Sequence, residues 1–225
     1  MARIPRVVAE NLPHHLIQRG NRNQRVFFQP SDHAEYLRLL TQYSQAHRVR
    51  IWAYCLMDTH VHLVVVPEQA ASLAKCFAKI HQRYTRMINF RHGWRGYLWQ
   101  GRFSSYLMDE PHLYAAIRYV ERNPVAAGMV GRAEKYPWSS AKAHVFKLHD
   151  PLLSPCYLEQ EITDWAAFLK GDDPQEAGQV EKHLRTGRPL GSPTFVQQLE
   201  ERLNRRIGKG KPGPKRASGN IGNGN

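Results

Sequence analysis

The feature that most constrains the fold of this chain is a pair of apolar runs separated by only two residues. Residues 51–57 and 60–66 each have the length and composition of a β-strand, and Pro67 ends the second run. Asp58 and Thr59 form the whole link between them, which is the length of a tight hairpin turn. The sequence therefore predicts a β-hairpin at this point.

Helix and strand patterns on either side of this hairpin complete the expected fold. A helix that opens at Glu110-Pro111 is expected to end near Asn123, because a residue before a proline disfavours the helical region. The order strand, helix, strand, strand, helix, strand, helix predicts an α+β fold, with helices packed on a ferredoxin-like antiparallel sheet. The other expected elements are a strand at 15–19, a helix capped by Ser31 or Asp32 that runs to about 47, a helix at 72–90 and a strand at 102–108.

The periodic patterns weaken after about residue 150. Short helices are expected at 165–169, 179–184 and 193–206, and the remainder of the chain is rich in Gly, Lys, Pro and Asn. We therefore expect an α+β domain over 10–145, a helical C-terminal extension over 146–207 and a flexible basic tail over 208–225.

The charge of the chain indicates what it binds. Lys and Arg number 32 against 19 Asp and Glu, a formal net charge of +13. Such an excess favours a polyanionic partner. Nucleic acid is favoured over a membrane, because no apolar stretch approaches the ~18 residues of a spanning helix. The three cysteines are far apart and form no C-x-x-C pair, which suits a reducing cytoplasm.

The second strand of the hairpin carries the first candidate site residues, His60 and His62. Residues two apart on a strand point to the same face, so the two imidazoles are expected to project together. Two nitrogen ligands on a rigid strand are a good start for a metal site. By itself the motif is weak, and a pair of histidines on a sheet face without a metal remains the alternative.

The helix at 110–123 carries the second candidate group. Tyr119 and Asn123 are four residues apart and are therefore neighbours on the helix surface, on one flank of its apolar stripe together with His112. A tyrosine hydroxyl is thus expected one turn from an amide oxygen that can complete a metal site. The alternative is a tyrosine at the edge of the core and an asparagine at the end of a helix.

Several sequence blocks, in the right order, resemble a known family. Residues 54–65, around His60-Val61-His62, look like the metal-binding strand of the HUH endonuclease superfamily. Residues 97–103, 119–130 and 136–140 resemble the later blocks of single-tyrosine transposases. Residues 186–192, followed by an amphipathic helix, resemble the C-terminal part of the REP-associated branch, named after repetitive extragenic palindromic DNA. The likeness covers about residues 10–205.

This resemblance implies an activity. His60, His62 and the side-chain oxygen of Asn123 would bind Mg²⁺ or Mn²⁺, although many relatives have Gln where this chain has Asn123. Tyr119 would attack single-stranded DNA and form a 5′-phosphotyrosine that a second 3′-hydroxyl can reverse. The implied substrates are REP-type DNA hairpins, and the implied protein is a monomer, with a dimer possible. It would be a bacterial, cytoplasmic protein, associated with the nucleoid when bound to DNA.

Basic and aromatic side chains outside these motifs are candidate DNA contacts. The helix at 72–90 is expected to carry a basic stripe whose alternative role is an ordinary solvated face. Trp94, Tyr97 and Trp99 are expected either to stack on unpaired bases or to pack as an aromatic cluster. The predicted DNA-binding residues are Arg102, Lys75, Lys79, Arg83, Arg86 and Trp99.

Two other functions remain open from the sequence alone. One is a protein that binds DNA hairpins and regulates without cutting them. The other is a metal-dependent phosphodiesterase that uses water, in which Tyr119 is structural. Tyr97, Tyr106 and Tyr114 are rival nucleophiles for which structural roles are expected.

Overall fold

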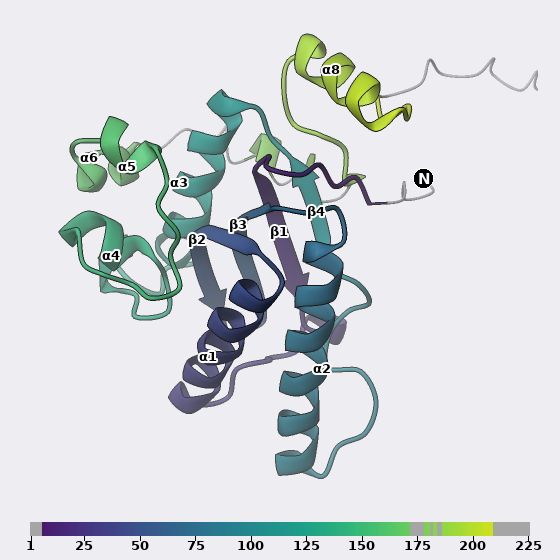
Figure 1. The fold of residues 1–225 in the computed structure, drawn as a ribbon. Helices are drawn as coiled ribbons and strands as arrows, with labels where there is room; N and C mark the ends of the chain where they lie inside the picture. The colour runs from purple at the N-terminus through teal and green to yellow at the C-terminus, as the bar shows by residue number, and fades with distance from the viewer. Residues whose placement is uncertain (1–5, 172–177, 181, 184–185, 209–225) are drawn as a thin grey trace, which may run out of the picture.

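The core of the molecule is a four-stranded antiparallel sheet. The computed structural model describes residues 6–171, 178–180, 182–183 and 186–208 (Figure 1). The strands are β1 (His14–Arg19), β2 (Val49–Met57), β3 (His60–Pro67) and β4 (Ser104–Leu107), in the spatial order β2-β3-β1-β4. The predicted hairpin is confirmed, since Met57 pairs with His60 across the two-residue turn. The predicted α+β class is confirmed as well.

Helices cover both faces of this sheet (Figure 1). On one face lie α1 (Pro30–Ala46) and α2 (Ser72–His92), and α3 (Glu110–Ala126) lies on the other. Alternation along β3 divides its side chains between the two layers. Val61, Leu63 and Val65 join the core under α1 and α2, whereas Val64 and Val66 join the core under α3. By the same alternation His60 and His62 point toward α3.

Two helix ends differ from the prediction. α1 begins at Pro30, and the carboxylate of Asp32 accepts the backbone N–H groups of Phe28 and Gln29, so the cap is Gln29 and not Ser31 or Asp32. α3 does not end near Asn123 but continues through the buried Pro124 to Ala126.

The continuation of α3 has a local explanation. A proline inside a helix removes one backbone donor, but its own φ angle is compatible with the helix. The carbonyl of Asn123 accepts the N–H of Ala127, and that of Pro124 accepts the N–H of Met129. Asn123 therefore lies inside the last turns of α3, where its side chain is held on the flank of Tyr119.

The C-terminal extension is helical, as predicted. The helices expected at 165–169 and 193–206 are confirmed, the latter ending early because Asn204 adopts a left-handed conformation with φ 45°. Of the helix expected at 179–184, the described residues 179–180 and 182–183 are helical, whereas the tail expected at 208–225 lies outside the described residues after residue 208. The remaining elements are η1 (Asn21–Asn23), η2 (Ala133–Lys135), α4 (Ala141–Phe146), α5 (Leu158–Glu161), α6 (Trp165–Lys170) and α8 (Pro193–Leu203).

The extension covers the β4 edge of the sheet. Leu190 donates its N–H to the carbonyl of Leu107 at 2.8 Å and accepts the N–H of Asp109 at 3.1 Å. α8 then packs against Leu107 and the segment at 7–9, so residues near the two ends of the described chain lie together (Figure 1). Backbone groups that an exposed edge strand would offer to another chain are thereby partly satisfied within the protein.

Candidate active site

The two histidines of β3 lie side by side under α3. His62 is fully buried and His60 partly so, and their ring centroids are 4.9 Å apart. The hydroxyl of Thr59 hydrogen-bonds Nδ1 of His60 at 2.9 Å. This bond engages one of the two ring nitrogens of His60.

Helix α3 brings Tyr119 and Asn123 to these histidines. The ring of Tyr119 lies 5.4 Å from that of His62, centroid to centroid. The side chain of Asn123 hydrogen-bonds His60. The structure thus brings together all four residues that the sequence predicted for the centre, two from a strand and two from a helix packed on it.

Both imidazoles are neutral at physiological pH. Burial lowers the pKa of His62 well below its ordinary value, and the positive charge of Arg19 acts in the same direction. Burial and the charge of Arg19 lower the pKa of His60 to about 4, although its hydrogen bond with Asn123 opposes this shift. A neutral imidazole has a lone pair that can bind a metal ion.

One atom of the site fits a metal ligand particularly well. Nε2 of His62 is buried and has no hydrogen-bond partner among the described residues. Buried polar atoms nearly always have a partner, so such an atom suggests an absent ion or ligand. No group of three His, Cys, Asp or Glu side chains suitable for a metal ion occurs in the part of the chain that the structure describes. A third protein ligand would therefore be the amide oxygen of Asn123.

Sequence reasoning missed two residues of β1 at this site. His15 lies on the same face of the sheet, with Nε2 2.9 Å from Nδ1 of His62 and Nδ1 2.6 Å from the hydroxyl of Tyr106. Arg19 pairs with His60 in the sheet register. The period-two pattern of this strand was visible in the sequence, but its pairing with β3, 47 positions away, was not.

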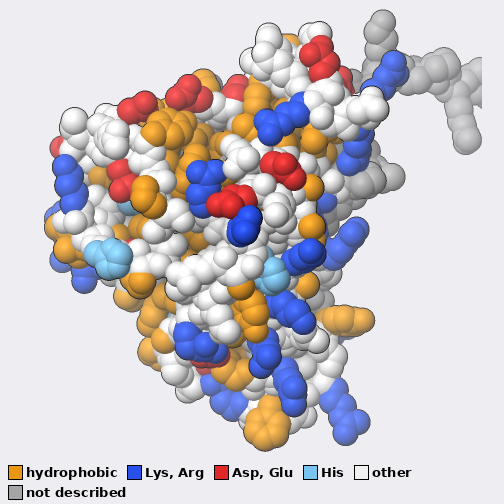
Figure 2. Space-filling view, viewed as in Figure 1, with side chains coloured by type: hydrophobic (Ala, Val, Ile, Leu, Met, Phe, Trp, Pro, Cys, Tyr) orange, Lys and Arg blue, Asp and Glu red, His pale blue; other side chains and the backbone are white. Residues whose placement is uncertain are grey.

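The predicted basic residues divide between two places. Lys75, Lys79, Arg83 and Arg86 are all exposed on α2, and Figure 2 shows Lys and Arg side chains gathered over this helix. Because α2 covers the opposite face of the sheet from α3, this stripe is not part of the centre around Tyr119.

Arg102, by contrast, follows a loop that is hydrogen-bonded to the end of β1. The N–H of Gln100 donates to the carbonyl of Arg19 at 2.8 Å, which places this loop along the end of β1 where His60 begins β3. Arg102 follows two residues later and is exposed. Arg19 and Arg102 are therefore exposed positive side chains near the end of β1.

The aromatic predictions have mixed outcomes. Trp99 is only 5% exposed and packs against Tyr36 and Tyr84, so its prediction as a DNA contact is wrong. A buried indole offers no face to a base. Trp94 and Tyr97 are 44% and 87% exposed, and Phe90, which the sequence analysis did not single out, is 89% exposed.

The rival tyrosines lie away from the position of Tyr119. Tyr106 is fully buried beside His15, and Tyr114 hydrogen-bonds Glu161 on the other flank of α3. His112, which shares the flank of Tyr119 on the helix, is bound to Asp109 at the start of α3. Of these side chains only Tyr119 contacts the ring of His62 from α3.

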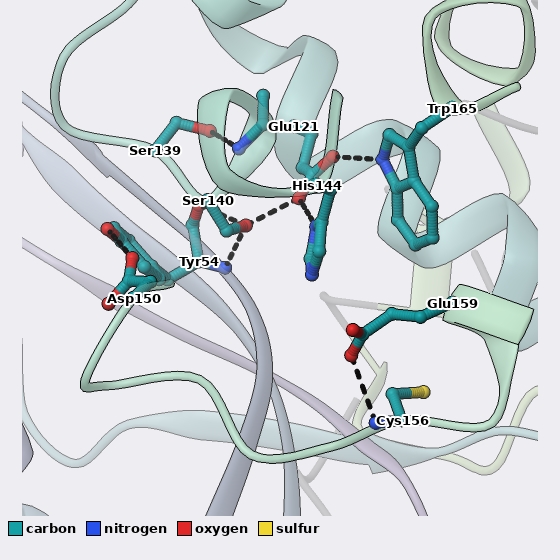
Figure 3. A network of polar contacts seen from close by, with 10 residues as sticks. Tyr54, Glu121, Ser139, Ser140, His144, Asp150, Cys156, Glu159 and Trp165 are labelled. Atoms are coloured by element: carbon teal, nitrogen blue, oxygen red, sulfur yellow. Dashed lines mark hydrogen bonds and ion pairs between the residues drawn. The ribbon is translucent and has the colours of Figure 1, made fainter. Parts of the chain in front are cut away.

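A buried carboxylate holds the other flank of α3 in place. Glu121 is 0% exposed and accepts hydrogen bonds from Ser140 at 2.5 Å, from Nδ1 of His144 at 2.6 Å and from the indole of Trp165 at 2.8 Å (Figure 3). Ser140 also accepts the N–H of Tyr54 on β2. The helix that carries Tyr119 is thereby tied to the sheet, α4 and α6 at once.

Comparison with known proteins assigns the chain to a class. The family model described as IS200-like transposase matches residues 8–123, about half of the chain, and includes both histidines and Tyr119. The chain belongs to this family of transposases. No curated protein matches the chain.

One solved structure supports the same fold. The chain is similar to a REP-associated tyrosine transposase solved bound to a REP hairpin, with a TM-score of 0.57 and 16% identity over 69% of this chain and 93% of that one. A protein assigned as a transposase from Deinococcus radiodurans covers 57% of this chain and 98% of its own, at 20% identity and a TM-score of 0.37. The expected family is thus confirmed, and the first of these structures shows the fold.

None of the helices that the structure describes is long and apolar enough to cross a membrane.

Proposed function

We propose that this transposase cuts and rejoins single-stranded DNA at palindromic hairpins of the REP type, through a covalent 5′-phosphotyrosine on Tyr119. The observation that carries the proposal is the meeting of Tyr119 with two neutral histidines and Asn123. A nucleophilic hydroxyl beside a set of N and O ligands is what a metal-assisted phosphoryl transfer requires.

The chemistry follows from the position of the tyrosine. The oxygen of Tyr119 attacks the scissile phosphorus, the bond to the 3′-oxygen breaks, and the proton of the tyrosine ends on that 3′-oxygen. The phosphodiester is conserved as a tyrosyl ester, so a 3′-hydroxyl from another strand can reverse the step and join. No ATP is consumed.

A divalent cation, Mg²⁺ or Mn²⁺, would be held by His60, His62 and Asn123 and would supply a Lewis acid for the scissile phosphate. Burial keeps both imidazoles neutral, and the buried Nε2 of His62 has no hydrogen-bond partner among the described residues. The hydrogen bond between Asn123 and His60 keeps the amide beside the histidines.

The surface around the site suits a folded single strand. Arg19 and Arg102 would bind phosphates next to the scissile bond, and the α2 stripe of Lys75, Lys79 and Arg83 would bind them further away. The exposed rings of Phe90, Trp94 and Tyr97 would serve as stacking platforms for unpaired bases. The similar structure was solved with a REP hairpin, which supports this substrate class.

We also propose that the protein acts as a monomer. The β4 edge, through which sheets of two copies join most simply, is covered by the chain's own residues around Leu190. A complete candidate site is formed within one chain. Sedimentation of the protein at cleavage-assay concentrations tests this directly.

The test of the proposal is a labelled hairpin oligonucleotide incubated with the protein and Mn²⁺, then run on a denaturing gel. Wild type should form a protein–DNA adduct that survives denaturation. Tyr119→Phe and the double variant His60→Ala/His62→Ala should lose it. Tyr114→Phe, on the other flank of the same helix, is the matched control and should retain it.

The other outcomes separate the alternatives. Cleavage by Tyr119→Phe would indicate a phosphodiesterase that uses water. Binding by wild type without adduct or cleavage, across several hairpins and metals, would replace the proposal with a hairpin-binding regulatory protein.

A further inference from the structure

We propose that His15 and Tyr106 are positioning residues that fix the tautomer and orientation of His62 as a metal ligand. This inference rests on the proposed function, since it assigns His62 to a metal. It concerns two side chains that come from two other strands of the sheet, and the ring of His15 also lies 5.9 Å from that of Tyr119, centroid to centroid.

The three side chains form a row across the sheet beneath α3. His62 comes from β3, His15 from the central neighbour β1 and Tyr106 from β4. Nε2 of His15 lies 2.9 Å from Nδ1 of His62, and Nδ1 of His15 lies 2.6 Å from the hydroxyl of Tyr106. All three are 0% exposed, so water does not compete for these bonds.

Bonding in this row selects one set of tautomers. A His62 that binds a cation through Nε2 must carry its proton on Nδ1. That N–H then donates to Nε2 of His15, whose own proton is on Nδ1 and donates to the oxygen of Tyr106. In the opposite arrangement Nε2 of His62 would carry a proton with no acceptor among the described residues, which costs free energy in a buried site.

The row therefore prepares His62 before any ion arrives. It leaves the lone pair of Nε2 available on a ring whose centroid lies 4.9 Å from that of His60, and it holds the ring against rotation. Hydrogen-bond partners of this kind change metal affinity by ~10–100-fold when they are removed.

The chain contains a matched control on the other face of the sheet. Tyr36 on α1 and His81 on α2 form a similar pair between these two helices, with Nε2 of His81 3.1 Å from the hydroxyl of Tyr36, which is fully buried. Neither residue lies beside a candidate metal ligand. Variants of this second pair report the general effect of breaking a His–Tyr bond in the interior.

The first experiment measures Mn²⁺ binding to metal-stripped protein by the electron paramagnetic resonance signal of unbound Mn²⁺. His15→Phe should raise the Kd by ~10–100-fold. His15→Gln, which can still accept the N–H of His62, should recover part of this loss, and Tyr106→Phe should raise the Kd less than His15→Phe does. His81→Phe and Tyr36→Phe should leave it unchanged.

The outcomes separate this inference from the proposed function. Binding that His62→Ala abolishes but that His15→Phe and Tyr106→Phe leave unchanged would overturn the positioning role alone. Wild type that does not bind Mn²⁺, or that binds it regardless of His62→Ala, would overturn both.

A second measurement uses the wild-type protein and so does not depend on whether a variant folds. Nitrogen-15 NMR of the imidazoles in the metal-stripped wild type should show the proton of His62 on Nδ1 and that of His15 on Nδ1. A proton on Nε2 of His62 would contradict the inference.

Discussion

Two buried polar clusters flank α3, and they differ in what they leave unsatisfied. On one flank Glu121 has both carboxyl oxygens bonded, to Ser140, His144 and Trp165 (Figure 3). On the other flank His62 has one nitrogen bonded to His15 and the other, Nε2, without a partner among the described residues. A polar group with every bond made holds structure together, whereas one with a bond left over is available to a ligand.

An unpartnered nitrogen alone does not make a site, as His144 illustrates. Its Nε2 also lacks a partner among the described residues, but its ring packs on Trp165 at 4.3 Å between centroids and is held by Glu121. His62, by contrast, has His60 and Tyr119 beside it. The comparison teaches that an unsatisfied atom indicates function when a second ligand and a nucleophile lie next to it.

The largest effect on stability is expected from a substitution in the cluster around Glu121. Glu121→Ala leaves three buried donors without their acceptor and should lower the free energy of unfolding by about 3–5 kcal/mol. Urea denaturation measures this. Glu110→Ala, at the exposed start of the same helix, is the control and should cost less than ~1 kcal/mol. Equal effects of the two variants would mean that the Glu121 cluster does not anchor α3.

A change in stability on binding a metal ion is expected from the other cluster, the one around His62. Mn²⁺ at 100 times its Kd should raise the free energy of unfolding of wild type by about 2.7 kcal/mol, because it binds only the folded state. Removal of the ion with a chelator should reverse the gain. The double variant His60→Ala/His62→Ala should show none of it, and Glu121→Gln should show all of it. A gain that persists in the double variant would place the ion elsewhere.

The hydrogen bond from Trp165 to Glu121 can be tested alone, with a smaller expected effect. Trp165→Phe keeps an aromatic ring but removes the N–H donor to Glu121, and should cost about 1–2 kcal/mol beyond the change of ring. Trp52→Phe is the matched control, because the buried indole nitrogen of Trp52 has no partner among the described residues. If both substitutions cost the same in urea denaturation, the indole bond to Glu121 contributes nothing.

The smallest expected effect is a dependence on pH. Burial lowers the pKa of His144, but the charge and hydrogen bond of Glu121 outweigh it, so this pKa lies above its ordinary value. The contribution of the His144–Glu121 pair to the free energy of unfolding is fully present below pH ~6.5, the ordinary pKa of histidine. It is lost as the pH rises through the pKa of His144 in the folded protein. The stability difference between wild type and Glu121→Gln should therefore shrink from pH 6 to pH 9. A difference that is constant or grows would contradict the assignment.

Local patterns in the sequence predicted the parts of the site that lie on one element. His60 and His62 share a strand face by their spacing of two, and Tyr119 and Asn123 share a helix flank by their spacing of four. The same periodicities predicted the hairpin, the helices and their order along the chain. These features depend on neighbours in the sequence, which is why they could be predicted.

Contacts between distant segments could not be predicted in this way. His15 reaches His62 only through the register of β1 on β3, and Glu121 reaches Trp165 only through the packing of α6 on α3. The sequence of the aromatic loop does not show which way its side chains point. Trp99 was therefore predicted to contact DNA at the surface, although it lies in the core. The predicted end of α3 near Asn123 was wrong, because backbone hydrogen bonds beyond Pro124 compensate for the N–H donor that proline lacks.

The central claim is that Tyr119 is the nucleophile, and the most direct test is to locate the covalent adduct. Trypsin should cleave after Arg118 and Arg122, which releases a four-residue peptide whose only tyrosine is Tyr119, while Tyr106 and Tyr114 fall together in another peptide. After reaction with a hairpin oligonucleotide and Mn²⁺, mass spectrometry should find the nucleotide on the peptide at 119–122. A nucleotide on the other peptide, or cleaved DNA with no protein-bound nucleotide, would contradict the account.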